Sequence, residues 1–229
     1  MGFQLGESVW SREGGYFSGK ELTKRVYIGA VSGFTVFGLL LAIIVARATM
    51  TWTPNIVLYL LVGLGIPIAG VFITLGSDKP VISLVGYCMV IIGLGAITGP
   101  TIALYKTGVV MIALMATGGV SVLMSLVGIL YPKSLESWGG YLFSALLAVL
   151  FVRVGQSIMA GFGVSESIWY VPWLEYGIAV LFSAYIVYDW NRALRLPRTL
   201  DNAVDCALAI FLDIINLFIT ILRIMGNKK

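Results

Sequence analysis

Two aspartates near the end of the chain are the residues whose type and position indicate chemistry. Asp189 closes one apolar stretch, and Asp213 lies well inside the next, with a basic loop between the two stretches. An ionised aspartate near the centre of a bilayer costs roughly 2.5–3.5 kcal/mol on insertion scales, so such a residue normally faces the protein interior and has a function. The pair is therefore the candidate site, and the remaining sequence must supply the elements that position it.

A pair of carboxyl groups in a medium of low dielectric constant has a simple chemistry. The two groups do not ionise together cheaply, so they share one proton, and the shared proton makes a short, strong bond. Loss of this proton replaces attraction with repulsion, which gives a pH-operated latch and a site that attracts cations. Carboxylate oxygens suit Ca²⁺. Two carboxylates are too few for a tight site, so Asp189 and Asp213 are predicted to bind Ca²⁺ weakly and transiently.

The two aspartates are expected at similar depths from the same side of the membrane. If the last helix enters the hydrocarbon near Asp205, Asp213 lies roughly 12 Å deep at ~1.5 Å per residue. If the preceding helix runs on to Leu194, Asp189 lies about 7 Å deep on the same scale. Helix tilt and side-chain length can bridge this difference, so we expect the two carboxyl groups to meet.

A stripe of small and polar residues shares the helical face of Asp213. At ~100° per residue this face also carries Asn202, Cys206, Ala209, Asn216, Thr220 and Arg223. A narrow polar stripe on an apolar helix is typical of a pore lining, and Cys206, Asn216 and Thr220 are its predicted members beside the aspartate. The alternative is a seam of hydrogen bonds between helices with no transport role.

The composition is that of a polytopic membrane protein. Of the 229 residues, 59% are hydrophobic and 11% are charged, whereas soluble domains contain about 25% charged residues. Seven apolar segments are long enough to cross a bilayer, at residues 26–46, 56–75, 81–98, 109–131, 141–162, 173–190 and 203–225. We predict an all-α fold with one seven-helix transmembrane domain over 26–229 and a polar N-terminal tail over 1–25.

Two prolines are expected to interrupt this pattern. Pro67 lies in the middle of the second segment and should kink it. Gly99-Pro100 should end the third segment, although apolar residues continue to Tyr105.

The basic residues set the predicted orientation. Arg192, Arg195 and Arg198 follow the sixth segment, and the loop over 163–171 before it has no Lys or Arg. The positive-inside rule then places the N-terminus in the cytoplasm. Lys228 and Lys229 leave the side of the C-terminus open. We expect a multi-pass protein of a prokaryotic plasma membrane, or of an endomembrane if the source is eukaryotic.

Several function classes are disfavoured. The chain has no histidine, the commonest metal ligand and acid–base residue, and the net charge of +4 reflects residues at span ends, not a nucleic-acid surface. Intramembrane aspartic proteases carry YD and GxGD motifs. Tyr188-Asp189 satisfies the first, but Phe211-Leu212 precedes Asp213. We predict neither an enzyme nor a resident cofactor.

Arg153 is a second expensive charge, near the centre of the fifth segment. A charge at this depth needs a partner, and the aspartate pair is the nearest plausible acidic site. Arg153 is therefore a candidate counter-ion for the pair. The alternatives are an ion pair with Glu166, or backbone carbonyls in a water-filled cavity.

The end of the chain resembles a known family. Residues 212–226 read LDIINLFITILRIMG, preceded by Tyr188-Asp189, and this signature resembles the transmembrane Bax inhibitor motif family. Asp189 and Asp213 fall on the two aspartate positions of the family, and the close match covers about forty residues. The resemblance implies seven helices, with the last one central and six wrapped around it in two layers.

The resemblance also implies a function. Bacterial relatives are pH-sensitive Ca²⁺ leak channels in which the two aspartates form the proton-sensing, gating pair. Eukaryotic relatives lower luminal Ca²⁺ and oppose cell death, and another bacterial branch modulates a membrane protease. Channel-forming relatives also carry an arginine latch near the end of the second helix. This chain has Ser77, Asp78 and Lys79 there and no arginine, and lysine lacks the planar fork.

Two hypotheses follow. The first is a pH-sensitive Ca²⁺ leak channel in contact with the lipid bilayer and with calcium ions. The second is a regulatory membrane protein that binds a membrane protease or another membrane complex, with the tail over 1–25 as a handle.

Overall fold

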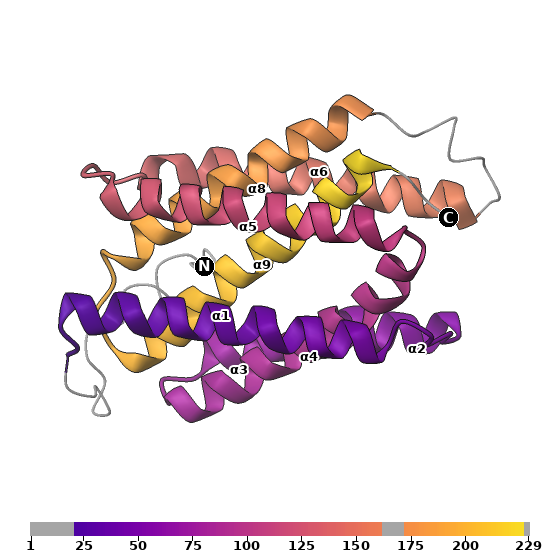
Figure 1. Cartoon of the computed structure of the whole chain (residues 1–229). Helices are drawn as coiled ribbons and strands as arrows, with labels where there is room; N and C mark the ends of the chain where they lie inside the picture. Colours follow the sequence, from indigo (N-terminus) through magenta and orange to yellow (C-terminus); the bar gives the residue numbers. More distant parts are fainter. Residues whose placement is uncertain (1–20, 162–171, 227–229) are drawn as a thin grey trace, which may run out of the picture. The chain divides into compact units, whose positions relative to one another are not determined.

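The computed structural model describes residues 21–161 and 172–226, and in these ranges all regular structure is helical. The elements are α1 (Lys24–Ala48), α2 (Ile56–Leu60), the π-helical turn η1 (Leu61–Gly65), α3 (Ile66–Gly76), α4 (Pro80–Ala103), α5 (Thr107–Leu130), the 3₁₀ turn η2 (Glu136–Trp138), α6 (Gly139–Gly161), α8 (Pro172–Ala193) and α9 (Leu200–Met225) (Figure 1). The all-α class is confirmed. Most of the predicted tail over 1–25 lies outside the described residues.

Six helical segments of the described chain are long and apolar enough to cross a membrane. They are Lys24–Ala48, Ile56–Gly76, Pro80–Ala103, Thr107–Leu130, Glu136–Gln156 and Leu200–Met225. One further long helix, α8, has 22 residues but carries the charged residues Glu175, Asp189 and Arg192. Its crossing, and the central position of the last helix, stay predictions.

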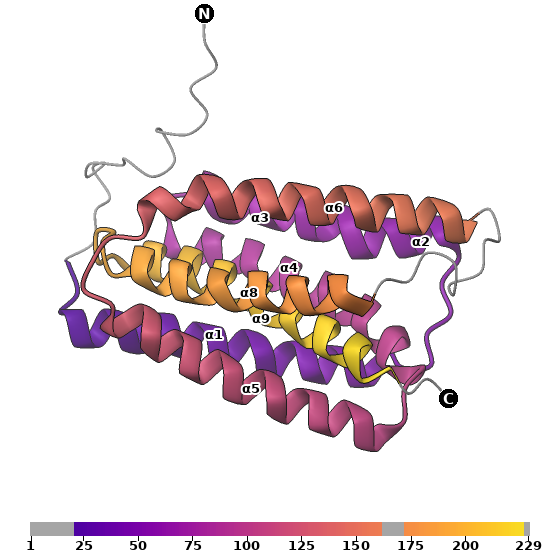
Figure 2. The same cartoon turned by 90° about the horizontal axis from the view of Figure 1, so that it is seen from above.

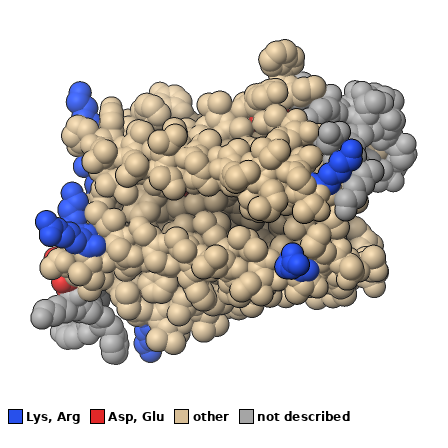
Figure 3. Space-filling view, in the orientation of Figure 1, with Lys and Arg blue, Asp and Glu red and all other residues tan. Residues whose placement is uncertain are grey.

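Large apolar side chains point outward along the helices, as expected for contact with lipid. Phe72, Val81, Leu130 and Phe151 are each at least 74% exposed, and the face shown in Figure 3 is almost entirely uncharged. Several apolar spans with apolar outer faces make the chain an integral, multi-pass membrane protein.

The two prolines behave differently. The π-helical turn Leu61–Gly65 comes directly before α3, in which Pro67 is the second residue, so the predicted break in this segment is present. The prediction that Gly99-Pro100 ends the next segment is wrong, because α4 continues through Pro100 to Ala103. The packing at Gly99 explains why the helix continues through Pro100. A Cβ atom at this position would lie 2.5 Å from the carbonyl oxygen of Ala46, so α1 packs directly against the backbone that the proline weakens.

The chain divides into two compact units. The first contains residues 1–106 and 193–212, with α1 to α4 and the beginning of α9. In this unit α4 lies between α1 and α3 (Figures 1 and 2). A Cβ atom on either Gly70 or Gly86 would lie 2.5 Å from the carbonyl oxygen of the other glycine. The backbones of α3 and α4 therefore touch, as small residues allow in membrane helices.

The first half of α9 is fixed to this unit by polar and aromatic contacts. The Ser83 hydroxyl of α4 donates to Asp201 Oδ1 at 2.6 Å. The rings of Tyr87 and Phe211 meet edge to face, with centroids 5.8 Å apart. These contacts fix both ends of the segment that leads to Asp213.

The second unit contains residues 107–192 and 213–227. Figure 2 shows α8 between α5 and α6. Gly128 of α5 lets the helices approach, since a Cβ atom there would lie 2.5 Å from the carbonyl oxygen of Val187. Gly139 of α6 lies against the Tyr188 hydroxyl in the same way.

The buried side chain of Asn191 holds the end of α8. It donates to the carbonyl oxygens of Tyr131 and Lys133, both at 3.1 Å, and accepts from the Leu135 amide at 3.1 Å. Because Asn191 is two residues from Asp189, these hydrogen bonds also fix the helix end that presents the aspartate.

Candidate functional site

The two predicted aspartates meet in the second unit. Asp189 lies in the last turns of α8 and Asp213 near the middle of α9, and their carboxyl groups are hydrogen-bonded to each other. Asp213 is 6% exposed and Asp189 is half-buried. A bond between two carboxyl groups needs one proton, because an ionised carboxylate can only accept.

One oxygen of Asp213 is fully enclosed. Apart from the bond between the two carboxyl groups, the buried Oδ2 of Asp213 has no hydrogen-bond partner among the described residues. A buried carboxyl oxygen without a partner is costly. The stability of the pair therefore depends on the proton that the two groups share.

Two further side chains of α8 act on the pair. Tyr185, one turn before Asp189, interacts electrostatically with both aspartates, and its ring lies perpendicular to that of Tyr188, with centroids 6.5 Å apart. The charge of Arg192, three residues after Asp189, acts on the Asp189 carboxyl group. Arg192 is therefore a cation close enough to influence Asp189.

The structure places the predicted counter-ion elsewhere. The Arg153 guanidinium makes a bidentate ion pair with Glu175, with Nη1 2.8 Å from Oε1 and Nη2 2.6 Å from Oε2. Glu175 lies fourteen residues before Asp189 on α8, which is about 21 Å along the helix axis. An arginine held by Glu175 cannot also serve the aspartates, so the assignment of Arg153 to the pair is corrected. The alternative partner Glu166 lies outside the described residues.

Glu175 is the residue that sequence reasoning missed. It is 1% exposed, and Arg223 of α9 adds a second cation at 3.9 Å from Oε1. Gln156 accepts a further hydrogen bond from Arg153 at 3.0 Å. The sequence did contain a signal for this ion pair. Two antiparallel helices that follow each other in the chain bring the start of α8 level with the end of α6, so Glu175 is expected near Arg153.

The members of the predicted stripe have different environments. Cys206 is buried in the first unit, with its sulfur 3.4 Å from the Tyr27 hydroxyl. In the second unit Thr220 is buried and its hydroxyl donates to the Asn216 carbonyl oxygen at 2.7 Å, while the Asn216 residue itself is exposed. Their role as a pore lining stays a prediction.

The described residues contain no cluster of three or more Cys, Asp or Glu side chains that could hold a metal ion. The pair alone offers too few ligands for tight Ca²⁺ binding, since Ca²⁺ takes six to eight oxygens.

The sequence is similar to a known protein family and to several of its named members. Residues 23–229 match the family model described as inhibitor of apoptosis-promoting Bax1. Bax inhibitor 1 of Saccharomyces cerevisiae is 31% identical over 111 residues, 45% of this chain and 37% of the yeast protein. Inner membrane protein YbhL of Escherichia coli is 27% identical over 116 residues, 46% of this chain and 47% of YbhL. Protein LIFEGUARD 3 of Arabidopsis thaliana is 33% identical over 89 residues, 38% of this chain and 33% of that protein.

These alignments span less than half of each relative, whereas the family model covers nearly the whole chain. The resemblance in the last forty residues is therefore confirmed over a much longer region. The chain belongs to the Bax inhibitor-1 family of integral membrane proteins.

Proposed function

We propose that this protein is a pH-sensitive leak for Ca²⁺, gated by the proton shared between Asp189 and Asp213. The observation that carries the proposal is the direct hydrogen bond between a buried carboxyl group on α9 and a half-buried one on α8. This bond joins two helices through a proton that solution pH can remove.

The size of the switch follows from electrostatics. With the proton in place the groups attract, and a charge-assisted carboxyl–carboxylate bond is among the strong hydrogen bonds in proteins. Without it, two unit charges at a hydrogen-bond distance of ~3 Å repel by about 5 kcal/mol at an effective dielectric constant of 20. A change of this size is large enough to separate α8 from α9 locally at the pair.

The ionised pair also suits the cargo. Two carboxylates present hard oxygen ligands of the kind that Ca²⁺ prefers. Attraction with incomplete coordination favours entry and release over storage, as permeation requires. We therefore expect Ca²⁺ flux to rise with pH as the shared proton is lost.

Flux into liposomes tests the proposal. The full chain is reconstituted with an internal Ca²⁺-sensitive dye, and the initial rate is recorded from pH 5 to pH 8. The wild-type rate should rise with pH, while Asp213→Asn and Asp189→Asn should each remove most of this dependence. Glu136→Gln neutralises an exposed carboxylate and is the matched control with a wild-type profile.

Two results would contradict the proposal: a wild-type rate that is blind to pH, or an Asp213→Asn rate with an unchanged pH profile. Absence of any flux, together with specific recovery of a membrane protease on the full chain, would favour the regulatory alternative instead.

A further inference from the structure

We infer that a basic pocket in the first unit is a binding site for the phosphate group of an anionic phospholipid. The pocket has a volume of about 460 Å³ and lies between the beginning of α1 and the loop that joins α8 to α9. Its lining residues are Glu21, Lys24, Tyr27, Leu194, Arg195, Leu196, Pro197 and Arg198. Neither the aspartate pair nor the ion pair of Glu175 belongs to it.

Hydrogen bonds and packing hold the segments on the two sides of the pocket in place. The Leu22 amide donates to the Arg198 carbonyl oxygen at 2.8 Å, which ties the segment before α1 to the loop before α9. Tyr27, which is fully buried, forms part of the lining and contacts Cys206 of α9 through its hydroxyl. The α8–α9 loop is thus held against α1, and the space between them is a defined feature of the unit.

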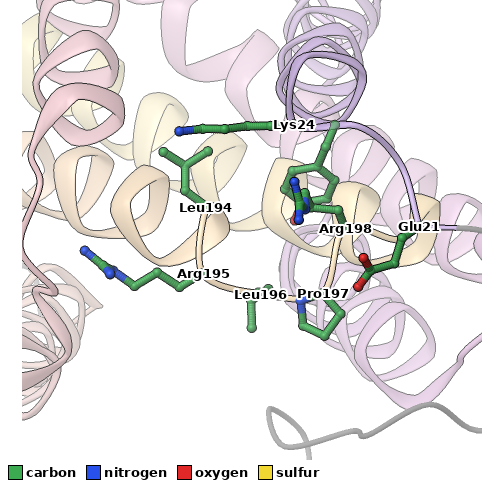
Figure 4. A pocket seen from close by; sticks show the side chains of 8 residues that line it. Glu21, Lys24, Leu194, Arg195, Leu196, Pro197 and Arg198 are labelled. Atoms are coloured by element: carbon green, nitrogen blue, oxygen red, sulfur yellow. The ribbon is translucent and has the colours of Figure 1, made fainter.

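The charges in the pocket select an anion. Lys24, Arg195 and Arg198 contribute three positive charges, against one negative charge from Glu21. Figure 4 shows the Lys24 and Arg195 side chains extending toward the same side of the pocket, with Glu21 on the other side. Arginine binds phosphate oxygens through two parallel hydrogen bonds, and lysine adds a point charge, so a phosphate group suits this set.

The position of the pocket identifies the source of the phosphate. Lys24 is the first residue of α1, a 25-residue helix apolar enough to span the membrane. The pocket therefore lies where the span begins, at the level of the lipid headgroups, and basic pockets between membrane helices are known sites for such groups. Leu194 and Leu196 provide apolar surface for the upper part of the lipid acyl chains, which free phosphate lacks.

Lipid retention in native mass spectrometry tests this assignment. The full chain in a mild detergent is titrated with phosphatidylglycerol, with phosphatidylcholine, or with inorganic phosphate. Phosphatidylglycerol should bind at least about tenfold more tightly than phosphatidylcholine, because each basic residue near a lipid headgroup contributes about fivefold. Inorganic phosphate at an equal concentration should not displace it.

Three variants separate the pocket from general charge. The triple change Lys24→Gln, Arg195→Gln and Arg198→Gln should abolish the preference for phosphatidylglycerol. The change Glu21→Gln should strengthen it several-fold, a gain that misfolding cannot produce. The control Arg47→Gln with Lys106→Gln removes two exposed charges of the same unit outside the pocket and should keep the preference.

Three results would overturn the lipid assignment. They are equal retention of the two lipids by the wild-type chain, a loss of preference in the control as large as in the triple variant, and displacement of the lipid by an equal concentration of inorganic phosphate. The last result would assign the pocket to a soluble phosphate compound.

Discussion

The ion pair between Arg153 and Glu175 gives a prediction whose size follows from its geometry. Arg153→Leu removes both guanidinium contacts, at 2.6 and 2.8 Å, from a carboxylate that is 1% exposed. Loss of one partner of a buried ion pair costs about 3–5 kcal/mol. Arg223 stays 3.9 Å from Glu175, where the attraction is about 4 kcal/mol at an effective dielectric constant of 20. We therefore expect a loss near the lower limit, about 3 kcal/mol.

Two companion variants make the reasoning testable. Glu175→Leu leaves Arg153, whose side chain is 24% exposed and can turn its guanidinium toward water, so we expect a smaller loss of about 1–2 kcal/mol. The double variant Arg153→Leu with Glu175→Leu removes both charges and should lie within about 1 kcal/mol of the wild type. Arg47→Leu, at an exposed arginine in the last turn of α1, is the control, with an expected change within about 0.5 kcal/mol.

The measurement is the free energy of unfolding of the full chain in mixed micelles, from a titration with sodium dodecyl sulfate followed by circular dichroism. The four forms of the pair make a double-mutant cycle, which isolates the energy of the interaction. Unfolding of Arg153→Leu at the wild-type detergent fraction would refute the reasoning. A double variant whose loss equals the sum of the two single losses would refute it as well.

Two further predictions concern close packing and hydrogen bonding. Gly86→Ala places a methyl group against Thr74 and against the Gly70 carbonyl oxygen and should lower the free energy of unfolding by about 1–3 kcal/mol. Gly29→Ala meets nothing within 4 Å and should be neutral or stabilising in the same titration. Asn191→Ala removes three hydrogen bonds and should cost about 1–3 kcal/mol. It should also speed hydrogen exchange in the peptide over 131–138, and unchanged exchange there would show that other contacts hold the loop.

The helices could be predicted because their signal is local. Long apolar runs bounded by charges or turn residues placed the seven long helical segments, and each observed end lies within about five residues of the prediction. The exception at Pro100 shows the limit of local reasoning. Proline removes one hydrogen bond from the helix, but the packing of Gly99 on α1 decides that α4 continues. That packing depends on a residue about fifty positions earlier in the chain.

The aspartate pair could be predicted because two acids in apolar helices have few alternatives. The partner of Arg153 could not be chosen so easily, since the choice depends on which helices are neighbours and at which level. With α6 and α8 antiparallel, the start of α8 faces the end of α6, and Glu175 becomes the nearer acid. Glu175 is the fourth residue of its helix, a position where sequence alone suggests an exposed acid at a helix beginning.

The partners of the buried acids separate structural roles from a proton-dependent role. Glu175 binds a guanidinium, and Asp201 accepts from the Ser83 hydroxyl at 2.6 Å. Both partners hold the acid in a single arrangement. Asp213 instead faces another acid, so its bond exists only while a proton is shared. Glu175→Gln should therefore lower the free energy of unfolding without moving the pH at which Ca²⁺ flux changes. Asp213→Asn should remove that pH dependence. If only Glu175→Gln shifted the pH profile, the proton that controls the flux would belong to Glu175 and not to the aspartate pair.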